Sequence, residues 1–296
     1  MISLIFLSYN SEEHILRILK NLNYENEIII VENSRNEKIK NLENYYKNLK
    51  VILPDKNLGF GRAVNLAIKH SKNDFVFINP ADVEISNELF QSLLNICENF
   101  NDFALLTPSY DNTQIHSNYF IFNKKKNITL KTKERDFILD EVDIIDGTIL
   151  LNKNKFNREI FDENFFIYFE TWDLSKRVQK QNMKMYVIKD LKFKHFGQQS
   201  HNSSFDHAAD IFRAYHYTWS KFYYFKKHNG YFTALRKIFP NFKRSLFNYY
   251  LKFNLNKKLK IENKFRLIAI IESIFLKKNN PEYQNYEFFI NLLKND

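Results

Sequence analysis

Short, almost wholly apolar segments alternate with segments of helical periodicity through the first 80 residues of the chain. An apolar run of this kind, bounded by turn residues, is typical of a strand that is buried on both faces. The predicted strands are residues 2–8, 27–31, 50–53 and 74–78, and the predicted helices between them are residues 12–21, 36–47 and 63–70. Strands that alternate with helices form parallel βαβ units. We therefore predict an α/β fold with a Rossmann-like, mostly parallel sheet flanked by helices.

Polar residues follow each predicted strand near the point where it ends. In order along the chain these are Ser8, Asn10, Glu32, Asn57, Asn79 and Asp82. The carboxyl ends of parallel strands meet at one edge of a sheet, and ligands bind there, so we expect these side chains to line a binding site. Asn57 also precedes a glycine turn that leads through Arg62 into the third predicted helix.

Further along, aromatic residues precede a cluster of acids. Residues 165–169 are apolar or aromatic, and Glu170, Thr171 and Asp173 follow at the start of a predicted helix that Thr171 or Asp173 would cap. An acid at a helix N-terminus beside aromatic side chains is suited to proton transfer. His195 follows in a loop rich in Gly, Gln and Ser, which would suit a ligand or a phosphate. A capped amphipathic helix and a surface histidine without chemical roles explain the same pattern.

Seven short motifs occur in the order typical of one protein family. They are SYNS at 8–11, VENS at 31–34, NLGFGRAVN at 57–65, INPAD at 78–82, DG at 146–147, FDENFFIYFETWDLSKR at 161–177 and HFGQQS at 195–200. With these motifs the chain resembles the family-2 glycosyltransferases, which have the glycosyltransferase A-type fold. The nearest branch contains bacterial rhamnosyl- and galactofuranosyltransferases. Two positions depart from it: Ala81 interrupts the usual Asn-Pro-Asp, so that the acid is Asp82, and Thr171 replaces the expected catalytic base.

The resemblance implies an inverting glycosyltransferase that moves a sugar from a nucleotide-sugar, a UDP- or dTDP-sugar, to a glycan or lipid-linked glycan in bacterial surface polysaccharide synthesis. It places the donor against Ser8, Asn10, Glu32, Asn57, Arg62 and Asn79. It places the acceptor against Asp146, Gly147 and Trp172. In this fold a divalent cation, Mn²⁺ or Mg²⁺, usually neutralises the diphosphate leaving group, and the expected metal ligands are Asp82 and His195, with Glu84 in reserve.

The identity of the catalytic base stays open after this comparison, because the hydroxyl of Thr171 cannot act as a base near neutral pH. We predict that Glu170 is the base, since its apolar neighbour Phe169 would make the carboxylate a stronger one. Asp173 is the alternative catalytic residue. A third alternative is a protein that has lost catalysis and only binds nucleotide-sugars or glycans. A nucleotidyltransferase would have a Gly- and Lys-rich phosphate loop after the first strand, and SYNSEEH is not such a loop.

Positive charge is concentrated at the end of the chain. Residues 221–296 hold 16 Lys and Arg against 5 Asp and Glu, and the whole chain has a net charge of +10. Cations interleaved with aromatic residues suit an anionic membrane surface, although a plain helical subdomain with buried aromatics explains the pattern equally well. We expect no nucleic-acid partner, because no nucleic-acid-binding motif is visible. We predict an α/β catalytic domain in residues 1–205 and a basic, aromatic-rich helical region in residues 206–296.

Several features bear on the cellular compartment. The single cysteine, Cys97, excludes a disulfide framework and fits a reducing environment. The sequence begins without a basic region and an apolar signal segment, and no apolar run reaches the ~18 residues that a membrane span needs. We therefore expect a cytoplasmic protein, either free or peripherally attached to the inner face of the cell membrane.

Overall fold

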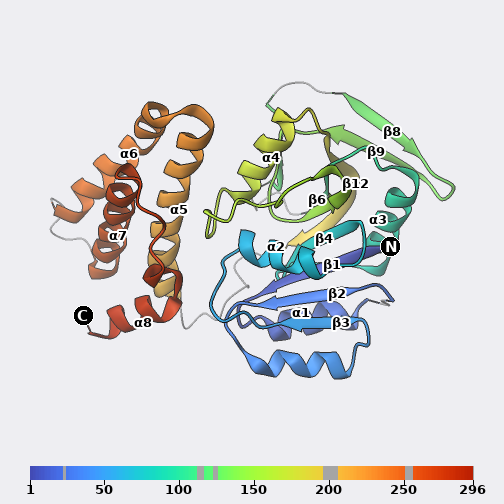
Figure 1. The fold of residues 1–296 in the computed structure, drawn as a ribbon, viewed down its shortest axis with the longest axis horizontal. Helices are drawn as coiled ribbons and strands as arrows, with labels where there is room; N and C mark the ends of the chain where they lie inside the picture. Colours follow the sequence, from blue (N-terminus) through green and yellow to red (C-terminus); the bar gives the residue numbers. More distant parts are fainter. Residues whose placement is uncertain (23–24, 112–116, 123–125, 196–205, 251–255, 296) are drawn as a thin grey trace. The chain divides into compact units, whose positions relative to one another are not determined.

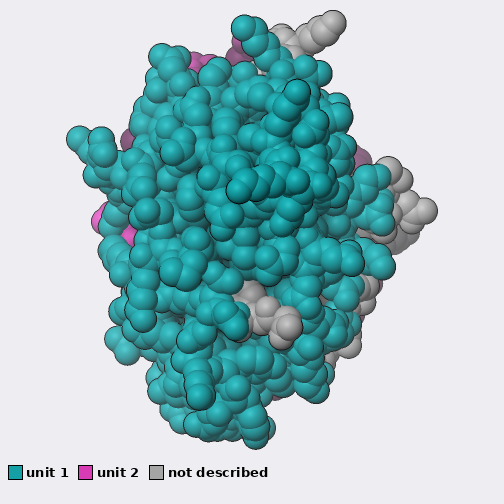
Figure 2. All heavy atoms as spheres, turned by 90° about the vertical axis from the view of Figure 1, so that its right-hand side faces the viewer, with its two compact units in different colours: residues 1–58, 62–161, 171–201 teal, residues 59–61, 162–170, 202–296 magenta. Residues whose placement is uncertain are grey.

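The computed structural model describes residues 1–22, 25–111, 117–122, 126–195, 206–250 and 256–295. Its contacts divide the chain into two compact units, coloured separately in Figure 2. The sheet unit is Met1–Leu58, Arg62–Phe161 and Thr171–His201, and the helical unit is Gly59–Gly61, Asp162–Glu170 and Asn202–Asp296. The predicted domains, 1–205 and 206–296, stay a prediction, because this division assigns two earlier segments to the helical unit.

The first four long strands of the sheet unit are parallel, as the apolar runs predict (Figure 1). They are β1 (Ile2–Ser8), β2 (Ile28–Glu32), β3 (Leu49–Ile52) and β4 (Phe75–Pro80), in the spatial order β3-β2-β1-β4. The elements between them are α1 (Glu12–Lys20), the 3₁₀ helix η1 (Glu37–Asn44) and α2 (Gly61–His70). β1 and β2 are almost wholly buried, which explains their continuous apolar sequence.

The rest of the sheet is mixed, and it continues from β4 in the order β11-β6-β12-β9-β8. β11 (Ile149–Asn152) is antiparallel to β4 and to β6 (Leu105–Tyr110), and β12 (Met185–His195) is parallel to β6. β8 (Asn127–Lys131) and β9 (Asp136–Glu141) form an antiparallel hairpin. Short pairings join β5 (Val83–Glu84) to β12 and β7 (Tyr119–Phe120) to β10 (Ile144–Ile145). The remaining elements are α3 (Asn87–Asn99), η2 (Lys153–Lys155) and α4 (Glu170–Lys180). The predicted fold class, an α/β sheet of mostly parallel strands flanked by helices, is confirmed.

The C-terminal part is helical, as predicted. It consists of α5 (Asp206–Asn229), α6 (Tyr231–Tyr250), α7 (Lys257–Ile274), η4 (Glu282–Gln284) and α8 (Tyr286–Asn295). Many of its aromatic residues form a core, centred on Phe212, Tyr215, Trp219, Phe265 and Phe289. Along the described parts of the chain, no helix combines the length and apolarity that a membrane-crossing segment requires.

Candidate functional site

The ends of β1, β2 and β4 bring three predicted site residues to one edge of the sheet. In the parallel pairing of β1 with β2, Ser8 lies opposite Glu32. In the pairing of β1 with β4, Phe6 lies opposite Asn79, two residues before Ser8. All three predicted residues are buried, with exposed fractions of 1% or less. Strand register therefore accounts for the grouping that the sequence predicts.

The carboxylate of Glu32 has one oxygen fixed by the protein and one that is not. Its Oε1 accepts hydrogen bonds from the backbone N–H of Ser34 at 2.8 Å and of Asn10 at 3.3 Å, and from the Ser34 hydroxyl. Asn10 has a φ of 56°, a left-handed conformation that asparagine tolerates better than most residues. The buried Oε2 accepts no hydrogen bond from the described residues. A buried acceptor without a donor costs about 1–3 kcal/mol, so this oxygen suits an N–H or O–H group of a ligand.

Asn33 connects the end of β2 to the segment before α2. Its Oδ1 accepts a hydrogen bond from the backbone N–H of Leu58 at 3.1 Å. The predicted donor-binding residues Asn57 and Arg62 flank this segment and are both half-buried. Within α2, Asn65 exchanges two hydrogen bonds with the backbone of Phe161, at 2.9 and 3.0 Å. These two bonds fix the part of α2 that belongs to the sheet unit.

The turn after β4 carries the predicted metal ligand Asp82. The side-chain amide of Asn79 donates to the carbonyl oxygens of Pro80 and Val83, both at 2.9 Å, so it shapes this turn. Asp82 is mostly buried, and Val83 pairs with His195 across β5 and β12. The backbone of His195 therefore lies beside the residue that follows Asp82. The side chain of His195 and the rest of the HFGQQS loop lie outside the described residues, and the role of His195 as a metal ligand stays a prediction.

Asp146, predicted to contact the acceptor, is held by the first turn of α4. Its Oδ1 accepts a hydrogen bond from Thr171 Oγ1 at 2.7 Å, and its Oδ2 accepts one from Trp172 Nε1 at 3.2 Å. Its backbone N–H donates to the carbonyl oxygen of Asn118 at 2.8 Å. The structure therefore brings together two of the predicted acceptor residues, Asp146 and Trp172, and adds Thr171 to them. A half-buried carboxylate oriented by two donors is well placed to accept a hydrogen bond from a ligand hydroxyl.

The backbone of Gly147, which follows Asp146, packs closely against the hydroxyl of Tyr110. Gly147 has a φ of +84°, and a Cβ at this position would lie 2.5 Å from the hydroxyl of Tyr110. The predicted acceptor role of Gly147 therefore has a backbone explanation as well. The pKa of Tyr110 is raised to about 12, chiefly by burial and to a smaller extent by the nearby carboxylates of Asp82 and Asp146, against a hydrogen bond with Thr148 that lowers it. Asp82 and Asp146 therefore both lie close enough to Tyr110 to influence its hydroxyl.

Sequence reasoning did not single out Tyr110 and Asn118. Asn118 donates from its amide to Thr107 Oγ1 at 2.8 Å and to the Pro108 carbonyl at 2.7 Å. Tyr110 ends the β-strand after the apolar run FALLT, so the rule used for the other strand ends would also have selected it. Asn118 gives no such signal, because it precedes a two-residue strand.

The two predicted catalytic acids have different surroundings. Asp173 has an exposed fraction of 0%, and its Oδ2 accepts a hydrogen bond from Arg177 Nε at 2.8 Å. Arg177 in turn donates to the carbonyl oxygen of Ile160. Glu170 is mostly buried and belongs to the helical unit, whereas Asp173 belongs to the sheet unit.

The helix that carries these acids begins earlier than predicted. Because α4 starts at Glu170, Thr171 and Asp173 lie inside its first turn, and the prediction that one of them caps the helix is wrong. Tyr168 and Phe169, with φ of 71° and 65°, immediately precede the helix. Phe169 packs against Tyr217 and Tyr224, with ring centroids 5.2 and 5.4 Å apart. These ring contacts help to hold an unusual backbone conformation that places Glu170 in the helix.

The described residues contain no group of three or more His, Cys, Asp or Glu side chains arranged to hold a metal ion. Asp82 offers a hard carboxylate oxygen next to the strand edge. Mg²⁺ and similar ions are often held by one or two carboxylates together with substrate phosphates. The carboxylate of Asp82 is of the chemical type that holds a cation together with a diphosphate, and its role as a metal ligand stays a prediction.

A model of the family described as glycosyl transferase family 2 matches residues 3–161. Among solved structures, S. aureus TarS 1–349 in complex with UDP-GlcNAc aligns over 94% of this chain and 93% of its own, with 16% identity and a TM-score of 0.50. The mannosyltransferase PcManGT from Pyrobaculum calidifontis, in complex with GDP-Man and Mn²⁺, aligns over 94% of this chain and 88% of its own, with 12% identity and a TM-score of 0.52. GalNAc-T7 with UDP, GalNAc and Mn²⁺ aligns over 91% of this chain and 55% of its own, with 11% identity and a TM-score of 0.53. At these identities the likeness is one of fold. No curated protein matches the chain.

Proposed function

Because the chain belongs to glycosyl transferase family 2, we propose that it is an inverting glycosyltransferase with a nucleotide-sugar donor. The acceptor is a glycan or lipid-linked glycan of bacterial surface polysaccharide. The observation that carries the proposal is the half-satisfied, buried carboxylate of Glu32, which lies in register with Ser8 at the strand edge. A nucleoside offers the N–H or O–H donor that this oxygen suits. Ser8, Asn10, Asn57, Arg62 and Asn79 complete the proposed donor site.

We propose a UDP- or dTDP-sugar as the donor. Structural neighbours solved with UDP-GlcNAc and with GDP-Man support a nucleotide-sugar as the class of ligand. They do not specify its nucleobase or its sugar. The motifs that resemble the rhamnosyl- and galactofuranosyltransferase branch favour transfer of one of those sugars, or of a hexose. Asp82 and His195 would hold Mn²⁺ or Mg²⁺, and an imidazole ligand favours Mn²⁺. Such a cation, when bound, neutralises the charge that develops on the departing diphosphate.

At the acceptor side, we propose that the carboxylate of Asp146 binds an acceptor hydroxyl. A carboxylate has about four acceptor positions, and Thr171 and Trp172 direct one hydrogen bond to each oxygen. The hydroxyl must lose a proton as it attacks the anomeric carbon. Glu170 stays our predicted base, and it is favoured over Asp173 because Asp173 is fully buried and paired with Arg177.

One observation favours a second candidate, a nucleotide-sugar- or glycan-binding protein without transferase activity. The hydroxyl of Thr171 stands where the related branch has a catalytic acid, and it is engaged with Asp146. For either function we propose a cytoplasmic location, or peripheral attachment to the inner face of the cell membrane, where a lipid-linked acceptor would be reached.

The test is a thermal-shift screen of the full chain with UDP-, dTDP- and GDP-sugars, with and without Mn²⁺. A ligand that binds only the folded state raises stability by RT ln(1 + [L]/Kd), about 2.7 kcal/mol at a hundredfold excess over Kd. We expect a shift with one donor class that Glu32→Ala abolishes and that the exposed control Glu37→Gln keeps. No shift with any nucleotide-sugar would refute the donor site. A shift without release of nucleoside diphosphate in the presence of acceptor glycans would favour the binding protein.

A further inference from the structure

Helix α6 exposes a row of large apolar side chains on the side away from its own buried residues. Its buried residues are Ala234, Ile238 and Ser245. The exposed large apolar residues are Phe232 (82% exposed), Phe239 (51%), Leu246 (40%), Phe247 (55%) and Tyr250 (63%). Phe232, Phe239 and Leu246 follow one another at intervals of seven residues, so helical periodicity places them on one line.

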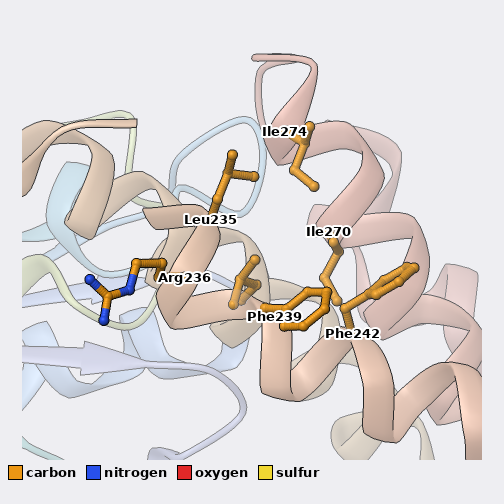
Figure 3. Close-up of a pocket in the computed structure, with 7 residues that line it drawn as sticks. Leu235, Arg236, Phe239, Phe242, Ile270 and Ile274 are labelled. Carbon is orange, nitrogen blue, oxygen red and sulfur yellow. The ribbon is translucent and has the colours of Figure 1, made fainter. Parts of the chain in front are cut away.

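A groove of about 600 Å³ between α6 and α7 continues this apolar face. It is lined by Leu235, Arg236, Ile238, Phe239, Phe242, Ile270 and Ile274. Figure 3 shows Phe239, Phe242, Ile270 and Ile274 around the same hollow, with the guanidinium of Arg236 pointing away from them. Phe239 both lines the groove and is exposed, so it joins the groove to the row on α6.

The C-terminal end of α7 adds to the same apolar surface. The hydroxyl of Tyr231 donates to the carbonyl oxygen of Ile274 at 3.1 Å, so the first turn of α6 lies beside the last turn of α7. Phe232 and Phe275, the residues that follow these two, are 82% and 72% exposed. Both helices therefore expose a phenylalanine at this end of the helical unit.

The charges on α6 all have one sign. The helix carries Arg236, Lys237, Lys243 and Arg244, all exposed, and its sequence contains no Asp or Glu. The two acids of α7 are engaged within the unit: Glu262 accepts a hydrogen bond from Arg266, and Glu272 accepts one from Tyr215, both at 2.5 Å. The Lys243 ammonium lies over the ring of Phe239, 4.8 Å from its centroid, so cations lie within the exposed apolar row as well as beside it.

We infer that α6 lies in the plane of an anionic phospholipid bilayer, with its exposed phenylalanines and the α6–α7 groove in the acyl-chain boundary and its cations at the lipid phosphates. A helix with an apolar face, basic flanks and no acids matches this environment. The charge complementarity favours lipid over a protein partner, because a protein would have to supply an acidic rim around an apolar ridge. Exposed phenylalanines and leucine would also gain nothing from a duplex phosphate backbone. The proposed function, with its lipid-linked acceptor, only explains why attachment to a membrane would be useful. If the membrane inference fails, the proposed donor binding is unaffected.

The first experiment tests the apolar face by flotation of the full chain with vesicles of phosphatidylcholine, alone or mixed with phosphatidylglycerol. We expect binding to the mixed vesicles at low salt, and a loss of about tenfold or more for each of Phe232→Ser and Phe239→Ser. Tyr45→Ser is the matched control, because Tyr45 is 80% exposed in the sheet unit. Circular dichroism and the melting temperature check that the variants fold.

The second experiment tests the cations. Replacing Lys243 and Arg244 together by Gln should weaken partitioning by about 25-fold, since each cation near an anionic surface contributes about fivefold. Lys131→Gln with Lys133→Gln is the control, because both lysines are exposed in the sheet unit. High salt should reduce binding of the wild type in the same direction.

Three results would overturn the inference. Equal binding to neutral and mixed vesicles would remove the role of the cations, and full binding by the two phenylalanine variants would remove the role of the apolar face. Binding to a DNA duplex but not to mixed vesicles would identify a nucleic-acid surface instead. The donor-induced thermal shift is measured on the same variants, so that loss of lipid binding is separated from failure of the proposed sugar transfer.

Discussion

The hydroxyl of Thr171 donates a hydrogen bond to the carboxylate of Asp146, with 2.7 Å between Oγ1 and Oδ1. The two residues are far apart in sequence, and the contact joins the first turn of α4 to the turn that follows β10. In the branch that the chain resembles, an acid usually stands at the position of Thr171. Two carboxylates at this distance would repel each other and share a proton. Thr171 instead donates a hydrogen bond to Asp146, which a second carboxylate at the same position could not do without a proton.

This contact predicts the effect of Thr171→Asp on transfer. The new carboxylate would repel Asp146 instead of donating a hydrogen bond to it, so kcat/KM for the acceptor near neutral pH should fall. Thr171→Val removes the donor without adding a charge, so it should weaken acceptor use less than Thr171→Asp does. The measurement is kcat/KM for the acceptor with both variants at neutral pH. A Thr171→Asp variant more active than the wild type at neutral pH would mean instead that position 171 is the base position and that the wild type is impaired.

The proposed role of Asp146 predicts a specific loss in Asp146→Asn. A hydrogen bond to a charged group contributes about 1.5–3 kcal/mol, so kcat/KM for the acceptor should fall about tenfold to a hundredfold. The donor-induced thermal shift should be retained, because Asp146 is outside the proposed nucleoside site. Asp136→Asn, at an exposed position of β9, is the control. Unchanged acceptor kinetics would refute the role of Asp146.

The two acids of α4 should respond differently to substitution. If Glu170 is the base, Glu170→Gln should keep donor binding and lower kcat by the ~10²–10⁴ typical of a lost general base. Asp173→Ala leaves Arg177, which is only 23% exposed, without its partner, so it should lower the free energy of unfolding by about 3–5 kcal/mol. Both quantities are measured on both variants. Normal turnover in Glu170→Gln would exclude it as the base.

The parallel strands could be predicted from the sequence because their burial on both faces requires continuous apolar runs. The site residues at their ends followed from the same rule, since Ser8, Glu32 and Asn79 are grouped by strand register alone. The contacts of Asp146 could not be predicted in this way. They depend on where α4 begins, and that start is set by the left-handed backbone of Tyr168 and Phe169, which bulky aromatic residues seldom adopt.

The C-terminal region shows a similar limit. Its charge and its helices could be predicted from composition and periodicity. Which of its aromatic residues are buried and which are exposed could not. Trp219 and Phe222 are buried, whereas Phe232 and Phe247 are exposed, although all four lie among lysines and arginines in the sequence. Which aromatics face a neighbouring helix is decided by the packing of α5, α6 and α7, and this packing depends on residues distant in the chain.

Two glycines with positive φ provide a matched pair for stability. Gly59 has a φ of +72°, and a Cβ there would lie 2.0 Å from the carbonyl oxygen of Phe166. Gly230 has a φ of +88°, and nothing lies within 4 Å of its Cβ position. Gly230→Ala should therefore cost only the left-handed backbone penalty of about 1–2 kcal/mol, and Gly59→Ala should cost clearly more. Urea unfolding of both variants checks the order, and equal losses would contradict the role of the close approach at Gly59.

His216 predicts a loss of stability on mild acidification. Its side chain is fully buried in α5, where Nε2 contacts the carbonyl oxygen of Tyr283 at 2.8 Å and Nδ1 contacts the amide of Asn279 at 3.1 Å. Burial lowers its pKa from 6.5 to about 3, against the Tyr283 carbonyl, which raises it. Between these two values the unfolded chain binds a proton that the folded chain does not. The stability that the neutral imidazole contributes is therefore complete above about pH 6.5 and is lost as the pH falls towards 3.

For one such group the free energy of unfolding changes by about 1.4 kcal/mol per pH unit. Because of His216, the free energy of unfolding of the wild type should therefore fall by about 2 kcal/mol between pH 7 and pH 5. His216→Gln, whose amide can still pair with Tyr283 and Asn279, should be less stable at pH 7 but should lose about 2 kcal/mol less over the same interval. His70→Gln, at an exposed position, is the control and should follow the wild type. The measurement is the free energy of unfolding in urea at both pH values for the three proteins. Parallel losses in the wild type and His216→Gln would show that His216 does not set the acid sensitivity of the helical unit.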